Sequence, residues 1–248
     1  MIDLFYGGLD FGTSGARISI ITNKFEIIFE NETKYIYEFR NPNGWIIACE
    51  ELLASIPKYI KRNLSKISIS GTSGTLMACS VKGRSLGSAI PYDQTCNIEK
   101  NLINAIAKGN QVLLNPYSSL CKALELLKIH GPNILLRHQS DWITGWILND
   151  WKFGEEGNNI KLGWDISSSS WPKEYKSINW TKSLPQIKKS GELLGKINVL
   201  LAKKFNLNQN LSIIAGTTDS NASFIAADLK EKDGLTVLGT TIVIKKRI

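Results

Sequence analysis

The first stretch that could carry chemistry is Asp-Phe-Gly-Thr-Ser-Gly at residues 10–15, between two apolar runs that predict strands joined by a tight turn. Because Gly12 and Gly15 have no Cβ atoms, their N–H groups and the hydroxyls of Thr13 and Ser14 can form a concavity for an anion such as phosphate. The carboxylate of Asp10 would repel a phosphate unless a cation such as Mg²⁺ lay between them. These residues therefore indicate metal-nucleotide chemistry, although by themselves they also fit an ordinary hairpin with an aspartate in its turn.

Three more turns rich in glycine and threonine follow apolar runs. They are Gly71-Thr72-Ser73-Gly74-Thr75, Gly216-Thr217-Thr218-Asp219-Ser220 and Leu238-Gly239-Thr240-Thr241. Ligands of α/β sheets collect where the strands end, so we expect the turn at residues 71–75 to face the same crevice as Asp10. Asp219 stands at the start of a predicted helix and can act there as a general base. Aspartate is also a preferred N-cap residue, which is the alternative explanation for Asp219.

Taken in order, these four turns resemble those of the FGGY family of carbohydrate kinases, and most of all its D-ribulokinase and xylulokinase-like members. The resemblance covers essentially the whole chain. The family belongs to the actin-like superfamily of ATP-binding proteins, so the resemblance implies an α/β, ribonuclease H-like domain with a mixed β-sheet flanked by helices. It also implies ATP and Mg²⁺ as cofactors and a sugar hydroxyl as the phosphate acceptor.

The resemblance gives each turn a role. The residues expected to bind the phosphates of ATP are Gly12, Thr13, Ser14, Gly15, Gly239, Thr240 and Thr241. Asp10 is the expected Mg²⁺ ligand, directly or through water, and Asp219 is the expected catalytic base. The residues expected to bind the substrate are Asp10, Ser73, Gly74, Asp93 and Asp219. Two alternatives remain open, because Ser73 can be a plain turn residue and Asp93 a capping or turn residue.

The expected domain organisation has three parts. Residues 1–228 form an N-terminal sugar-binding domain, and the charged residues 229–234, which end in glycine, form a linker. Residues 235–248 form the first hairpin of a C-terminal nucleotide-binding domain that is otherwise absent, whereas the family's kinases have a second domain of similar size.

Two functions follow from this organisation. The first is ATP-dependent phosphorylation of a ketopentose such as D-ribulose or D-xylulose, with a separately encoded C-terminal half as a further partner. The second is a non-catalytic remnant of a split or decayed kinase that binds a sugar or a partner and transfers nothing.

The net charge of +8 raises nucleic acid as a possible partner. The lysines are spread along the chain, without an arginine-rich stripe or an aromatic motif that stacks on RNA bases. We therefore expect no nucleic-acid partner, and the positive field would instead attract ATP and sugar phosphates.

Cysteine usage and hydropathy indicate the compartment. The four cysteines, at positions 49, 79, 96 and 121, are widely separated and are expected to be reduced core thiols rather than a zinc site or a disulfide framework. The N-terminus does not resemble a signal peptide, and no run of about 18 apolar residues occurs. A cytoplasmic protein without membrane contact is the expectation.

Hydrophobic periodicity predicts the elements that position the turns. Besides the first hairpin, the expected strands are residues 25–30, 35–39, 67–70 and 211–215, the expected helices are 45–60, 98–107, 118–129, 140–149, 198–205 and 220–228, and a second hairpin joins 235–238 to 242–244. Trp142 and Trp146 are four residues apart in one helix, so they are expected to pack inward. Residues 155–165 are interpreted as a polar connection without chemistry.

Overall fold

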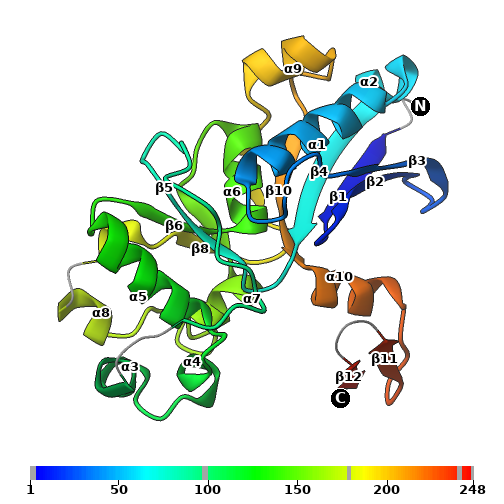
Figure 1. Cartoon of the computed structure of the whole chain (residues 1–248). Helices are drawn as coiled ribbons and strands as arrows, with labels where there is room; N and C mark the ends of the chain where they lie inside the picture. The colour runs from blue at the N-terminus through cyan, green and yellow to red at the C-terminus, as the bar shows by residue number, and fades with distance from the viewer. Residues whose placement is uncertain (1–3, 97–99, 178–179, 239–241, 247–248) are drawn as a thin grey trace.

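A six-stranded sheet forms the centre of the computed structural model, which describes residues 4–96, 100–177, 180–238 and 242–246 (Figure 1). Its strands, in the order β3-β2-β1-β4-β10-β9 across the sheet, are β1 (Phe5–Phe11), β2 (Gly15–Thr22), β3 (Ile27–Lys34), β4 (Leu64–Gly71), β9 (Leu193–Lys196) and β10 (Ser212–Thr218). Strand β2 is antiparallel to both β1 and β3, and β9 is antiparallel to β10, whereas β4 runs parallel to β1 and β10. The sheet is therefore mixed, as predicted, and the parallel strands β1, β4 and β10 end at the same edge.

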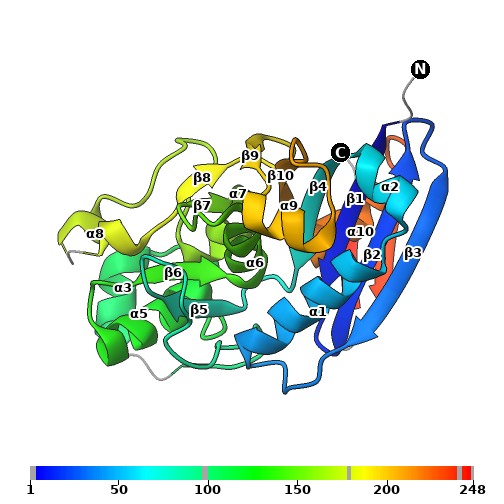
Figure 2. The same ribbon diagram turned by 90° about the horizontal axis from the view of Figure 1, so that it is seen from above.

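Helices cover one face of this sheet. Alternate residues of β1, including Leu9 and Phe11, are buried, and they belong to a core that contains Trp45 and Leu52 of α1 (Pro42–Ser55). The other helices with residues in this core are α2 (Lys58–Asn63), α6 (Gln139–Leu148) and α9 (Val199–Phe205). Figure 2 shows α1, α2 and α9 on one side of the strands. Trp142 is 4% exposed within the same core and Trp146 packs against it, so the expected inward packing is confirmed.

The helix predicted for residues 45–60 is two helices. Asn41 caps the first helix by accepting a hydrogen bond from the Asn43 N–H, and α1 ends at residue 55. Pro57 then lies between α1 and α2, because proline has no N–H to donate and its ring disfavours a helical conformation at the preceding residue.

The prediction of two strands, at residues 25–30 and 35–39, was wrong, because the structure has a single strand in this region. One strand, β3, runs through the polar residues 31–34, and residues 35–39 form no strand. An edge strand that contacts its neighbour on one side tolerates polar side chains on both faces. Tyr35 instead folds over the first turn, where its hydroxyl donates to the carbonyl of Gly12 over 3.0 Å.

A second group of elements stands beside the edge at which β1, β4 and β10 end, and Figure 1 shows it to the left of the sheet. It contains the antiparallel pair β5 (Leu76–Cys79) and β6 (Leu135–His138) and the parallel pair β7 (Phe153–Glu155) and β8 (Gln186–Lys188). Its helices are α3 (Lys100–Ala107), α4 (Gln111–Leu114), α5 (Ser119–His130), α7 (Glu156–Asn159), α8 (Glu174–Ser177), η1 (Ile160–Leu162) and η2 (Thr181–Ser183). A second hydrophobic core, which includes Leu120, Leu136 and Trp180, holds this group together. The predicted polar connection at 155–165 is thus partly helical, which corrects the earlier interpretation.

The C-terminal part begins with α10 (Asp219–Ala226) and continues into an antiparallel hairpin of β11 (Gly234–Leu238) and β12 (Ile242–Lys246). The pairing of the two strands confirms the predicted hairpin. Lys245 of β12 contacts α10 by donating hydrogen bonds to Ser220 O and Asn221 Oδ1, over 2.8 and 2.9 Å.

Two compositional predictions can be compared with this fold. All four cysteines are buried, which confirms the prediction that they lie in the core. Of the helices in the described ranges, none has the length and apolar character needed to cross a bilayer.

Candidate functional site

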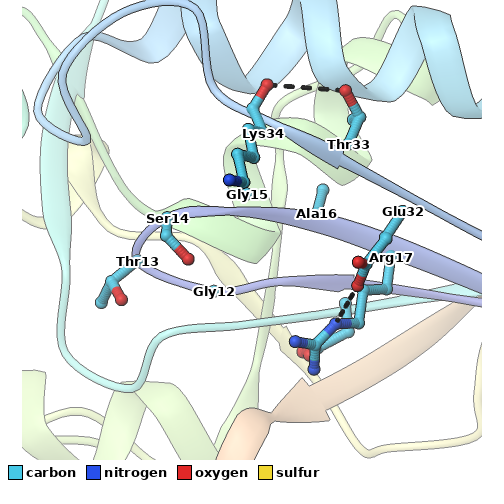
Figure 3. A pocket seen from close by; sticks show the side chains of 10 residues that line it. Gly12, Thr13, Ser14, Gly15, Ala16, Arg17, Glu32, Thr33 and Lys34 are labelled. Carbon is cyan, nitrogen blue, oxygen red and sulfur yellow. Dashed lines mark hydrogen bonds and ion pairs between the residues drawn. The ribbon is translucent and has the colours of Figure 1, made fainter.

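The turn between β1 and β2 forms one wall of an open pocket of about 480 Å³ (Figure 3). The N–H of Gly12 donates to the carbonyl of Gly15 over 3.0 Å and closes the turn. A Cβ atom on Gly15 would lie 2.2 Å from the carbonyl oxygen of Thr33, so this position accepts only glycine. Thr13 and Ser14 are exposed at the tip and line the pocket, where their hydroxyls and backbone are available to an anion.

Asp10 lies near the end of β1 and lines the same pocket. It is paired in register with Ser70 of the parallel strand β4, and the Ser70 hydroxyl donates to Asp10 Oδ1 over 2.8 Å. This hydrogen bond fixes the carboxylate beside the first turn.

The turn at residues 71–75, which we name the acceptor turn after its predicted role, follows β4, and several side chains hold it in place. The N–H and hydroxyl of Thr72 donate to Gln139 Oε1 over 2.9 and 2.8 Å, and the N–H of Gly74 donates to Asn158 Oδ1 over 3.3 Å. Lys161 Nζ donates to the carbonyl of Ser73 over 3.2 Å. Gly74 has φ of +91°, a backbone conformation that favours glycine.

Asp219 is the first residue of α10, directly after β10. The N-cap is its neighbour Thr218, whose hydroxyl accepts a hydrogen bond from the Asn221 N–H over 3.2 Å. The capping position proposed as the alternative for Asp219 is therefore occupied by Thr218. The Asp219 carboxylate accepts a hydrogen bond from the Ser220 N–H over 2.7 Å.

The surroundings of Asp219 link the three turns. Burial is the largest effect and raises the pKa of the Asp219 carboxyl group above its ordinary value, and the charge of Asp10 raises it further. The Ser220 N–H, the Ser73 N–H and the Lys161 ammonium lower the same pKa and offset part of this rise. The structure thus brings Asp219 near Asp10 from the first turn and Ser73 from the acceptor turn. A partly desolvated carboxylate with a raised pKa is a stronger proton acceptor than an exposed one.

Asp93 is exposed and lies in a turn that the Gln94 N–H closes by donating to Pro91 O over 3.2 Å. Its neighbour Tyr92 contacts the acceptor turn, because the Tyr92 N–H donates to the Thr75 hydroxyl over 3.2 Å. Asp93 is therefore next to the acceptor turn, and its substrate contact stays a prediction alongside the turn role. The predicted phosphate-binding residues Gly239, Thr240 and Thr241 lie outside the described residues.

Sequence reasoning missed four side chains around the acceptor turn. They are Lys122 of α5, Gln139 of α6, Asn158 of α7 and Lys161 of η1. The sequence contained one indication that Lys122 is buried. It lies on the same face of its helix as Ser119 and Leu126, and a lysine is unusual on a helix face that packs inward. The other three had no such signal in the sequence.

The carboxylates of Asp10 and Asp219 are the groups available for a divalent cation. Within the described part of the chain, no cluster of three or more His, Cys, Asp or Glu side chains could enclose a metal ion. Mg²⁺ commonly uses one or two protein carboxylates and completes its shell with water and substrate phosphates, so this donor set fits Mg²⁺ delivered with a nucleotide.

Comparison with known proteins relates the sequence of this chain to carbohydrate kinases. The sequence model described as the FGGY family of carbohydrate kinases, N-terminal domain, matches residues 5–226. A xylulose kinase from Lactococcus lactis is 22% identical over 264 residues, which cover 96% of this chain and 52% of the relative.

Solved structures show the same fold. The ligand-bound xylulose kinase from Lactobacillus acidophilus superimposes with a TM-score of 0.80 at 17% identity, over 97% of this chain and 53% of that one. A gluconate kinase from the same organism gives 0.81 at 17% identity, over 98% and 54%. The predicted α/β, ribonuclease H-like fold of the actin-like ATPases is confirmed, and the chain spans about half the length of these relatives.

Proposed function

Because the chain belongs to the FGGY family of carbohydrate kinases, we propose that it supplies the acceptor site and the catalytic base of an ATP-dependent sugar kinase. The observation that carries this proposal is the convergence of three turns on one carboxylate. Asp219 lies close enough to Asp10 for the charge of one to raise the pKa of the other, and the Ser73 N–H acts on the same carboxylate.

In the proposed reaction, the oxygen of a sugar hydroxyl attacks the γ-phosphorus of ATP, the bond to the oxygen that bridges the β- and γ-phosphates breaks, and ADP leaves. Asp219 takes the proton of the attacking hydroxyl. The backbone of residues 12–15 and the Thr13 hydroxyl bind the transferring phosphate, and the acceptor turn, with Ser73 and Gly74, orients the sugar. Residues 239–241 are proposed to close on the phosphates from the other side.

Asp10 is the proposed ligand of Mg²⁺, either directly or through water. When bound, Mg²⁺ would supply positive charge that neutralises the phosphates of ATP. The Ser70 hydroxyl donates a hydrogen bond to Asp10 Oδ1 over 2.8 Å and so holds the Asp10 carboxylate beside the pocket.

The proposed acceptor is a ketopentose such as D-ribulose or D-xylulose. The support comes from the motif resemblance and from the xylulose kinases among the relatives. A gluconate kinase is equally similar in fold, so the choice of sugar depends on side chains around the acceptor turn rather than on the fold.

The second candidate function is a binding module without catalysis. The chain spans about half the length of the kinases that it matches. The family mechanism places ATP between two domains, so we propose that catalysis needs a C-terminal nucleotide-binding half. The genomic sequence directly downstream of Ile248 distinguishes the two candidates, because only the kinase requires an adenosine-binding half.

The direct test is phosphoryl transfer by this chain combined with that C-terminal half. ATP and Mg²⁺ would be supplied with D-xylulose, D-ribulose, D-gluconate or glycerol, and sugar phosphate would be measured. The kinase function predicts turnover of at least one sugar and its loss in the Asp219→Asn variant. A combined protein that binds ATP and a sugar and transfers no phosphate would support the binding module instead.

A further inference from the structure

Lys122 is a fully buried lysine, 0% exposed, near the start of α5 and next to the acceptor turn. Its Nζ donates hydrogen bonds to the carbonyl of Gly74 over 2.8 Å and to the carbonyl of Tyr92 over 3.2 Å. These carbonyls belong to two separate segments, and each segment holds a residue expected to bind the acceptor. One ammonium group therefore joins the acceptor turn to the segment that carries Asp93.

Stability alone does not explain a lysine at this position. Burial lowers the pKa of Lys122 to about 8, so the surroundings disfavour its charged form. None of the ion pairs among the described residues includes Lys122, so no carboxylate compensates its charge directly. An apolar side chain would fill the space without this desolvation cost.

What lysine adds is a charged donor for two carbonyls at once. Other described contacts of the acceptor turn come from Gln139, Asn158 and Lys161. The Thr75 hydroxyl makes the second link to Tyr92 by accepting its N–H over 3.2 Å. Charge-assisted hydrogen bonds are stronger and shorter than neutral ones, which suits a group that must hold two backbone segments at a fixed spacing.

We propose that Lys122 is a positioning residue for the acceptor, which holds the Ser73–Gly74 backbone and the Tyr92–Asp93 segment at the spacing that sugar binding requires. The inference rests on the proposed function for the identity of the ligand. The positioning of the two segments can be measured without any ligand.

The groups around the Lys122 ammonium define when it is charged. The Lys161 ammonium disfavours its charged form and Asp93 favours it. Burial raises the pKa of the Cys96 thiol to about 12, so this thiol adds no charge near pH 8. His138 of β6 faces the same region, and burial keeps the pKa of its ring below the ordinary value, so it adds no charge near neutral pH. The charged donor is therefore present below about pH 8 and is lost above it.

Amide hydrogen exchange in the Lys122→Met variant tests the proposal. We expect peptides that contain residues 71–76 and 90–94 to exchange at least about tenfold faster than in the wild type, while β1 peptides do not change. Lys128→Met is the matched control, because Lys128 is exposed on the same helix. Unchanged exchange at the acceptor turn, or an equal increase in every peptide, would overturn the proposal.

The wild-type chain gives a second measurement that does not depend on how the variant folds. Protection at residues 71–76, corrected for the chemical exchange rate, should rise between pH 7 and pH 9 while protection in β1 changes less. The reason is that opening of the acceptor turn exposes Lys122, and a lysine whose pKa is lowered in the closed state favours the open state while it is protonated. Constant protection of the acceptor turn over this range would overturn the proposal. Calorimetric titration with D-xylulose, D-ribulose, D-gluconate and glycerol then separates the two claims: if the wild type binds none of these, the proposed function fails, and the exchange data still decide the role of Lys122.

Discussion

At the scale of single residues, the proposed function depends most on Asp219. Its backbone position at the start of α10 is fixed by Thr218, which caps the helix and leaves the Asp219 carboxylate beside Asp10 and Ser73. A carboxylate in this place can accept the proton of a bound hydroxyl, and its raised pKa improves it as a base.

The Asp219→Asn substitution keeps the shape of the side chain and removes the base. We expect kcat of the combined kinase to fall by about 10²–10⁴-fold with little change in folding, because general-base catalysis contributes about that much. Steady-state kinetics on the purified variant measures the effect, and Asp228→Asn, an exposed aspartate just beyond the same helix, is the control. A kcat close to that of the wild type would leave Asp219 with a structural role only.

Asp10 should act on the nucleotide more than on the sugar. We expect Asp10→Asn to weaken Mg²⁺-dependent use of ATP, with a smaller effect on sugar affinity, because its carboxylate lines the pocket beside the first turn. Calorimetric titration of sugar and of Mg²⁺-ATP into the variant compares the two affinities. Equal losses would show that Asp10 is wrongly assigned.

The lowered pKa of Lys122 makes the free energy of unfolding increase with pH. Its pKa is about 8 in the folded chain against 10.5 for an ordinary lysine, so the unfolded chain binds more protons between these values. The free energy of unfolding of the wild type should therefore rise relative to Lys122→Met from about pH 8 to 10.5, by up to about 3 kcal/mol. Urea denaturation at several pH values measures this difference, and a constant difference between the two proteins would contradict the buried ammonium.

At the scale of elements, β10 is the strand that delivers Asp219, and Gly216 is its tightest point. A Cβ atom there would lie 1.8 Å from the carbonyl oxygen of Ile69 in β4, at a place where the pairing of β10 with β4 is irregular. The backbone of Ile69 cannot move away without disturbing the sheet, so a side chain at Gly216 would weaken the pairing of β10 with β4.

We expect Gly216→Ala to destabilise the fold by at least about 1–3 kcal/mol, the usual cost of an overpacked core position. Thermal or urea denaturation measures the loss. Gly8→Ala in β1 is the matched control, since a Cβ atom there meets nothing within 4 Å. A stable Gly216→Ala protein would mean that β10 and β4 are less closely paired than described.

The sequence predicted the strand ends well because apolar strands and glycine turns are local signals. The turns at residues 12–15 and 71–75 and the start of α10 all lie where predicted. Residues 35–39 were mistaken for a strand because Tyr35 and its neighbours alternate like one, while long-range contacts with the first turn decide their path. Lys122, Asn158 and Lys161 gather around the acceptor turn only through the packing of α5, α7 and η1, which periodicity does not reveal.

At the scale of the whole molecule, the turns proposed to bind the sugar and the proposed base Asp219 follow the strands β4 and β10 of the central sheet. The hairpin of β11 and β12 contacts α10 through Lys245, at the carbonyl of Ser220 next to the proposed base. We propose that this hairpin leads into the nucleotide-binding half. The acceptor site would then be formed in this chain, and phosphoryl transfer would await the other half.

The measurement that tests this account most directly is calorimetric titration of D-xylulose and D-ribulose into the 248-residue chain alone, with exchange of residues 71–76 and 217–222 followed in parallel. We expect saturable binding of at least one sugar, slower exchange at both segments when it is bound, and no detectable sugar phosphate after addition of ATP and Mg²⁺. Sugar binding that leaves both segments unchanged would contradict the acceptor site described for Ser73, Gly74 and Asp219. Rapid phosphorylation by the chain alone would contradict the division of the kinase into two halves.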